Sequence, residues 1–168
     1  MDLPKTMDLD QQLKLLIDEA PQYGVPSPVM EQAVTPVLKA FAHQLQHLEY
    51  QVLQTLDRDW VLTTLSDRAQ PKLEKKAIYA FATLKDAAHF QGTSDPQVMA
   101  VPMPVTQILF QLFSLEQLDS IIFMETPGNL NIGKEIHRAD LQNLIYKQLE
   151  QLGKSPRPKP GNIPPNLA

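Results

Sequence analysis

The sequence predicts an α+β fold, in which a mixed sheet of five to six strands packs against helices. Apolar residues recur at helical spacing near both ends of the chain, and short β-rich runs bounded by turn residues occupy its middle. The expected order of elements is αα-βββ-α-β-α-ββ-α. Such an order is typical of a mixed sheet with helices packed on it.

Residues 1–49 are predicted to form a pair of helices that packs on the rest of the domain. The first helix runs from Leu9 to Ala20 and stops at Pro21. The second carries an apolar stripe from Met30 to Leu48, with Pro36 inside it. A proline there either kinks the helix or makes it restart with Thr35 as its cap. The stripe keeps its phase across Pro36, which favours a kink.

The middle of the chain is predicted to supply the strands. Residues 50–56 and 60–66 are β-rich and flank a short turn, Asp57-Arg58-Asp59, so we expect a hairpin. Both faces of the predicted strand 60–66 carry bulky apolar side chains, which indicates a sheet that is covered on both faces. The remaining strands are expected at 77–82, 97–101, 120–125 and 133–136.

Three further helices are expected between and after these strands. Residues 83–86 (TLKD) match a capping box that opens a short helix. Residues 105–115 are apolar nearly all round, which predicts a buried helix. The last helix covers 138–152, and its expected inner face consists of Leu141, Leu144, Ile145, Leu149 and Leu152.

The charge of the chain is distributed unevenly. The net charge is −4, but the last sixteen residues contain Lys154, Arg157 and Lys159 and no acid, so all 19 acidic side chains lie before them. Phosphate binding depends on clustered lysine and arginine, so the acidic body argues against a nucleic-acid partner. Residues 153–168 also contain five prolines, which predicts a disordered or polyproline-like tail. That tail either solubilises the protein or offers its basic residues to a partner.

Composition excludes several kinds of chemistry. There is no cysteine, so disulfides, thiolate catalysis and cysteine-based metal sites are excluded. The chain has no apolar run long enough to span a membrane and no pattern of a signal peptide, so we expect a cytoplasmic protein. His43 and His47 stand four apart on a predicted helix, but their HQLQH segment lacks the glutamate of a zinc protease. We expect neither a metal nor a cofactor.

The loop FMETPGNLNIG, residues 123–133, is the candidate binding segment. Its two glycines do not form a Gly-x-Gly or Gly-Lys-Ser/Thr pattern, so it is not expected to cradle a phosphate. Proline followed by glycine is ordinary turn chemistry. The interpretation is an ordered hairpin loop. Its candidate binding residues, with the histidine that follows it, are Glu125, Gly128, Asn129 and His137.

Several segments after Tyr50 resemble the N-terminal domain of the SseB (enhanced serine sensitivity) family. They are AIYAFATLKDA at 77–87, VPMP before the buried helix, SIIFMETPG at 120–128, and IHRADL at the start of the last helix. The family usually has Asn before its Pro-Gly, where this chain has Glu125-Thr126. The resemblance implies an SseB-like α+β domain over 50–152, small and non-enzymatic, with no catalytic residues to transfer. As a whole the chain is also similar to uncharacterised proteins of cyanobacteria.

No catalytic constellation is recognisable, so the sequence favours a non-enzymatic interaction or regulatory module. Its contacts with an unidentified protein partner, or with a second copy of the chain, would come from the sheet edge, the N-terminal helices and the tail. The alternative is a small-ligand binder or an enzyme that uses a pocket at the 123–133 loop. That alternative requires a pocket beside Gly128, with Glu125 or His137 directed into it. A flat apolar face would favour a protein partner instead.

Overall fold

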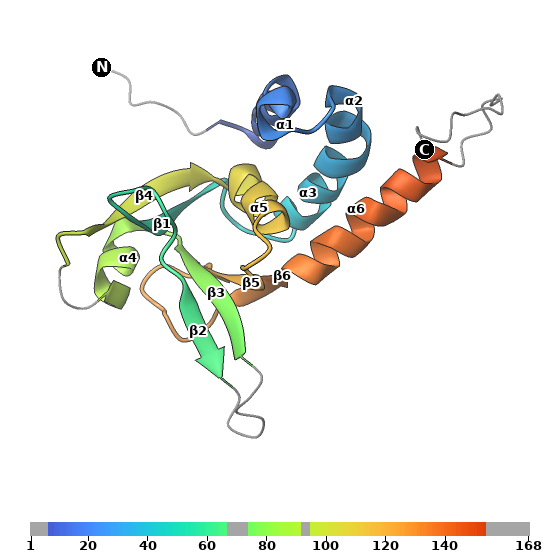
Figure 1. Cartoon of the computed structure of the whole chain (residues 1–168). Coiled ribbons are helices and arrows are strands. Elements are labelled where there is room, and N and C mark those ends of the chain that lie inside the picture. Colours follow the sequence, from blue (N-terminus) through green and yellow to red (C-terminus); the bar gives the residue numbers. More distant parts are fainter. Residues whose placement is uncertain (1–6, 67–73, 92–94, 154–168) are drawn as a thin grey trace, which may run out of the picture.

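A computed structural model describes residues 7–66, 74–91 and 95–153, and its α+β fold confirms the predicted fold class. Within these residues five helices pack on a mixed, open sheet of six strands (Figure 1). The strands are β1 (Glu49–Thr55), β2 (Thr63–Ser66), β3 (Glu74–Phe81), β4 (Val98–Pro104), β5 (Ser120–Met124) and β6 (Lys134–His137). The predicted tail with Lys154, Arg157 and Lys159 lies outside the described residues.

The sheet has the order β4-β1-β3-β5-β6, and β2 pairs with β3 beside β1. The β3–β5 pair is parallel, with Ala77 opposite Ser120 and Phe81 opposite Met124, and the other pairs are antiparallel. β1 pairs with β3 at Gln51 and Val52, and β2 pairs with the beginning of β3. Two strands therefore share one edge of β3, one after the other.

The predicted hairpin of 50–56 with 60–66 is wrong for most of its length. The turn is present, and the Thr55 N–H donates to the Asp59 carbonyl oxygen at 2.8 Å, but only Gln54 and Trp60 form a bridge. Beyond Trp60 the chain leaves β1 and joins β3 as β2. The side chains of β2 are half-buried or exposed, so the expected coverage of both faces of the sheet does not extend to this strand.

Helices cover one face of the sheet thoroughly. They are α1 (Leu9–Asp18), a continuous helix of α2 (Ser27–Val29), η2 (Met30–Val34) and α3 (Thr35–Ala42), then α5 (Val105–Ser114) and α6 (Arg138–Gly153). A short 3-10 turn, η1 (Ala20–Tyr23), follows α1. The main core lies between these helices and the sheet, and the largely buried α5 helix lies in its middle, as predicted.

The helix around Pro36 is continuous, in line with the favoured alternative, but it ends earlier than predicted. It does not restart at Thr35, whose hydroxyl donates to the Glu31 carbonyl oxygen at 3.2 Å instead of capping. The segment Met30–Val34 is a π-helix, and this wider turn accommodates a residue that has no N–H and whose ring crowds the preceding turn. The helix then ends at Ala42 rather than at Leu48. The HQLQH segment therefore lies in turns, and the expected helical spacing of His43 and His47 is wrong.

A smaller core lies on the opposite face of the sheet. It is built around Leu53, Phe81 and Met124, together with Ala87 of the short helix α4 (Leu84–Gln91). The α4 helix lies on the other side of the sheet from α5 (Figure 1). Phe90 of α4 packs against Phe81 with a ring-centroid distance of 5.0 Å. This face is covered at one end only, because α4 is short.

The end of one strand and the inner face of one helix were mispredicted for identifiable reasons. Pro102 and Pro104 lie inside β4 rather than after it, because β4 is an edge strand, where a missing N–H is tolerated. On α6, Leu141 and Ile145 are buried as predicted, but Leu144 and Leu152 are 41% and 39% exposed. The end of α6 projects away from the body of the molecule (Figure 1). Its apolar stripe therefore continues beyond the part of the helix that packs on the core.

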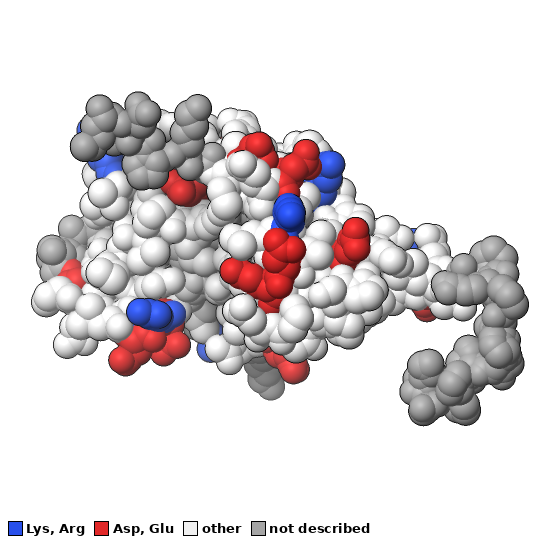
Figure 2. Space-filling model, turned by 90° about the horizontal axis from the view of Figure 1, so that it is seen from above, with Lys and Arg blue, Asp and Glu red and all other residues white. Residues whose placement is uncertain are grey.

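The described helices are too short or too polar to cross a membrane. Seen from above, the surface is mostly uncharged, and the charged side chains in view are mainly acidic (Figure 2). Two acids of α1 face lysines: Asp18 lies 4.0 Å from Lys14, and Asp10 lies 3.4 Å from Lys39.

Candidate functional site

A hollow of about 500 Å³ lies on the face of the sheet that carries the smaller core, here called the second face. It is found between the first turns of α4 and the Pro-Gly turn that follows β5. It is open to solvent on one side. Its lining residues are Thr83, Lys85, Asp86, His89, Pro127, Gly128 and Leu130. Gly128, one of the four predicted binding residues, is therefore beside a pocket.

Two hydrogen bonds fix the walls of this hollow. Thr83 caps α4, and its hydroxyl oxygen accepts from the Asp86 N–H at 3.0 Å, as the capping box predicts. The second half of that box is wrong, because the Asp86 carboxylate does not reach back to the cap. Its two oxygens accept the Gly128 N–H at 3.0 and 3.1 Å. This bond ties the Pro-Gly turn to α4.

The backbone of the turn suits its residues. Gly128 has φ of 82°, a conformation that glycine adopts without steric cost. The Asn129 side-chain oxygen accepts from the Asn131 N–H at 2.9 Å, so Asn129 shapes the loop rather than reaching into the hollow. Leu130 packs on the smaller core. The loop is thus anchored on both sides of its tip.

Ionisable side chains of both signs line the hollow. Lys85 and His89 stand one turn apart on α4 and are exposed, whereas Asp86 is 5% exposed. A buried carboxylate in the first turn of a helix is favoured by the helix dipole. The hollow therefore places a buried acid next to an exposed lysine and an exposed histidine.

Glu125 was predicted to face a ligand, but it faces the main core. It is 9% exposed, and one carboxylate oxygen accepts from the Gln46 N–H at 2.9 Å while the other accepts from the Tyr50 hydroxyl. Burial, followed by this hydrogen bond to Glu125, raises the pKa of Tyr50. The His47 Nε2 atom lies 2.8 Å from the Glu125 carbonyl oxygen. Glu125 therefore joins the end of β5 to the segment after α3.

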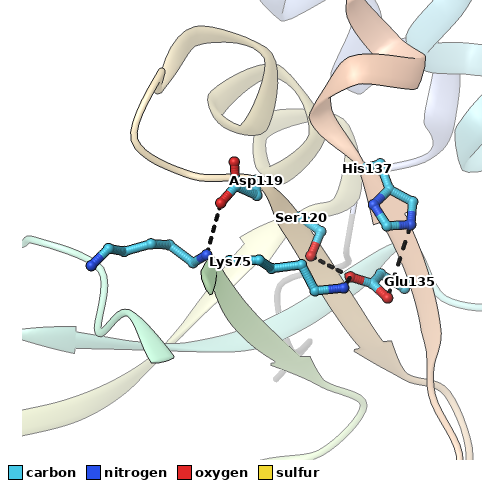
Figure 3. Close-up of polar contacts among 6 residues, drawn as sticks. Lys75, Asp119, Ser120, Glu135 and His137 are labelled. Carbon is cyan, nitrogen blue, oxygen red and sulfur yellow. Dashed lines mark hydrogen bonds and ion pairs between the residues drawn. The ribbon is translucent and has the colours of Figure 1, made fainter. Parts of the chain in front are cut away.

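His137 lies away from the hollow, in a polar group on the open part of the second face (Figure 3). Lys75 Nζ and the Ser120 hydroxyl both donate to Glu135 Oε2, each at 2.6 Å, and His137 Nε2 lies 3.9 Å from Glu135 Oε1. Burial alone would raise the pKa of Glu135, but the hydrogen bonds from Lys75 and Ser120 outweigh it and leave the pKa below its ordinary value.

This polar group joins three strands and does not have the form of a nucleophile with its base. Ser120 is fully buried, and its hydroxyl donates to a carboxylate rather than to an imidazole. Beside it, the Asp119 carboxylate accepts from the Lys76 N–H at 2.8 Å and fixes the start of β5 against β3. Within the described part of the chain, no group of three or more His, Cys, Asp or Glu residues could hold a metal ion.

Sequence reasoning missed most of the lining of the hollow. Lys85, Asp86 and His89 belong to a segment whose pattern indicated only a capped helix. A lysine and a histidine four apart, just after a cap, were the available signal, but this spacing is common on exposed helix faces. Comparisons with protein-family models, curated proteins and solved structures gave no match.

Proposed function

We propose that the chain is a non-enzymatic binding module that holds a small ligand in the hollow beside Gly128. The observation that carries this proposal is the hollow itself, where a few polar groups converge beside apolar residues. Its size of about 500 Å³ lies within the roughly 300–1,000 Å³ typical of small-molecule sites. A pocket at this position favours the ligand alternative over a flat partner surface.

Binding rather than catalysis is supported by the roles of the reactive groups. The Thr83 hydroxyl and the Asp86 carboxylate both hold backbone N–H groups, so neither is poised against the other as a nucleophile and its base. The proposal keeps the predicted SseB-like assignment, which also implies a module without catalytic residues. It also keeps the cytoplasmic location, which the absence of cysteine supports.

A fragment screen by ¹H–¹⁵N NMR of the full chain tests the proposal. We expect binding fragments to shift the amide signals of Lys85, Asp86 and Gly128 and to leave those of α6 unchanged. The variant His89→Trp should occlude the hollow and abolish these shifts. Ala88→Trp is the matched control, because Ala88 is an exposed neighbour on α4 that does not line the hollow. A screen without hits at the hollow would refute the proposal.

A second proposal is that the chain contacts a protein partner, or another copy of itself, through the exposed stripe of α6. Leu144 and Leu152 belong to this stripe and are 41% and 39% exposed, and exposed apolar residues are a common feature of interfaces. Sedimentation and native affinity purification should show an association that Leu144→Lys weakens and that Glu150→Lys, at an exposed position on another face of α6, leaves intact. Equal behaviour of both variants would count against this surface.

A further inference from the structure

We infer that the ligand of the hollow is a small zwitterion whose ammonium group binds the Asp86 carboxylate and whose acidic group faces Lys85 and His89. This inference rests on the proposed function, since it names the chemical class of the ligand at the same site. Three features carry it: an incompletely satisfied buried acid, two exposed basic residues next to it, and apolar walls.

The first feature is the hydrogen bonding of Asp86. A carboxylate offers about four acceptor positions. Within the described residues the Asp86 side chain accepts a single N–H, that of Gly128, which its two oxygens share. No ion pair there involves Asp86 either. Because a 5% exposed carboxylate is costly without partners, its remaining acceptor positions favour a ligand that brings N–H donors.

The second feature is the charge next to this acid. Lys85 and His89 line the same hollow, and neither takes part in an ion pair with another described residue. A purely cationic ligand would be repelled by Lys85, and a purely anionic ligand would be repelled by Asp86. A ligand that carries both an ammonium and an acidic group satisfies both sides at once.

The third feature is the remainder of the lining. Pro127 and Leu130 provide apolar surface opposite α4. A ligand that is charged at one end only and apolar elsewhere therefore matches the walls. The simplest such molecule is an α-amino acid with an apolar side chain, and a short zwitterionic peptide shares its chemistry. The size of the hollow, about 500 Å³, accommodates either one.

The test titrates the full, ¹⁵N-labelled chain with four probes: L-leucine, N-acetyl-leucine, leucinamide and leucyl-leucine. Leucine or leucyl-leucine should shift the amide signals of Asp86 and Gly128. N-Acetyl-leucine lacks the ammonium group and leucinamide lacks the carboxylate. Both should bind at least about tenfold more weakly, because each leaves a charged hydrogen bond unmade.

Variants of Asp86 and Lys85 test which residue binds the ammonium group and which binds the carboxylate of the ligand. Asp86→Asn keeps a side-chain oxygen for the Gly128 N–H but loses the charge, so it should remove the preference for leucine over N-acetyl-leucine. Lys85→Gln should remove the preference for leucine over leucinamide. Lys147→Gln, on α6, is the control for loss of a lysine elsewhere and should change neither preference.

The outcomes separate this inference from the proposed function. If leucyl-leucine binds and leucine does not, and Asp86→Asn weakens that binding, the inference holds with a peptide as the source. If N-acetyl-leucine or neutral fragments bind the hollow as tightly as the zwitterions, the inference is overturned and the proposed function stands. If no probe and no fragment shifts the amide signals of the residues that line the hollow, both the inference and the proposed function are refuted.

Discussion

Glu125 illustrates how one buried side chain can hold together distant parts of this molecule. Its carboxylate accepts from the Gln46 N–H and the Tyr50 hydroxyl, and its carbonyl oxygen lies next to His47. The Tyr50 ring in turn packs against Phe123 with a centroid distance of 4.9 Å. The residue directly before the Pro-Gly loop is thereby fixed, and with it one wall of the hollow.

Replacing Glu125 should cost stability rather than ligand binding alone. Glu125→Ala leaves one buried donor, the Tyr50 hydroxyl, and one part-buried donor, the Gln46 N–H, without their acceptor, and we expect the free energy of unfolding to fall by about 1–3 kcal/mol. Glu125→Gln keeps one acceptor and should lose less. Urea unfolding followed by circular dichroism measures both values. A loss within about 0.5 kcal/mol for Glu125→Ala, the range of neutral surface changes, would show that these hydrogen bonds contribute little.

The polar group around Glu135 predicts a pH dependence of stability. The pKa of Glu135 in the folded protein lies below its ordinary value, because the bonds from Lys75 and Ser120 outweigh burial. A lowered pKa means that, on acidification, the Glu135 carboxylate is protonated in the unfolded chain before it is protonated in the folded protein. Its stabilising effect is therefore present above the unfolded pKa of about 4.3 and is lost as the pH falls through the folded pKa.

Urea unfolding at several pH values tests this sign. The stability difference between the wild type and Glu135→Gln should be constant at neutral pH and shrink as the solution is acidified below about pH 4.3. Glu150→Gln, an exposed position on α6, should show no such trend. A difference that grows on acidification would contradict the assignment.

At the scale of elements, the loop between β5 and β6 contains two glycines that are needed for different reasons. Gly128 has φ of 82° and open space where a Cβ would stand. Gly133 has no such backbone, but a Cβ there would lie 2.7 Å from both Ile122 Cγ2 and Met124 Sδ. The first glycine serves conformation, and the second allows close packing of the loop on β5.

Matched substitutions distinguish these two reasons. Gly128→Ala should lower the free energy of unfolding by about 1–2 kcal/mol, and Gly128→Asn by less, because asparagine tolerates a positive φ. At Gly133 the order should reverse, since asparagine is larger than alanine and the obstacle is steric. Chemical denaturation of the four variants gives the comparison. The same order at both positions would refute the assigned roles.

The elements also show which parts of the fold the sequence could predict. The α5 helix and the Thr83 cap follow from local pattern, and both are present. The hairpin was mispredicted because the pairing of β2 with β3 is a tertiary choice that the turn at Asp57–Asp59 does not reveal. The carboxylate of Asp86 was assigned to a local cap, but a backbone N–H 42 positions away takes it instead.

The candidate site was predictable to the same limited extent. Pro-Gly chemistry identified Gly128, because a turn needs a residue that adopts positive φ. Lys85 and His89 could not be associated with Gly128, since the parallel pairing of β3 with β5 is what brings α4 next to the loop. A single sequence carries no signal of that pairing.

At the scale of the whole molecule, the N-terminal helices share the main core with the sheet. Leu16 and Leu38 lie in one cluster with Ile108 of α5 and Ile121 of β5. Gln12, 1% exposed, adds a polar tie. Its side-chain nitrogen donates to the carbonyl oxygens of Met7 and Leu48, at 2.9 and 3.0 Å. Its oxygen accepts from the backbone N–H and the hydroxyl of Thr106, at 3.1 and 3.0 Å.

Truncation of the N-terminus should therefore disrupt folding, whereas truncation of the C-terminus should leave stability unchanged. Removing residues 1–48 would expose the apolar face of α5, and we expect this fragment to lose cooperative urea unfolding and to bind a hydrophobic dye. Removing residues 154–168 deletes a proline-rich segment of low hydrophobicity, so the unfolding midpoint should stay that of the full chain. A cooperative transition of the 49–168 fragment with a midpoint near that of the full chain would show that the sheet with α4, α5 and α6 folds without α1 and α3. In that case the interface between α1, α3 and α5 would be an attachment between two units rather than part of one core.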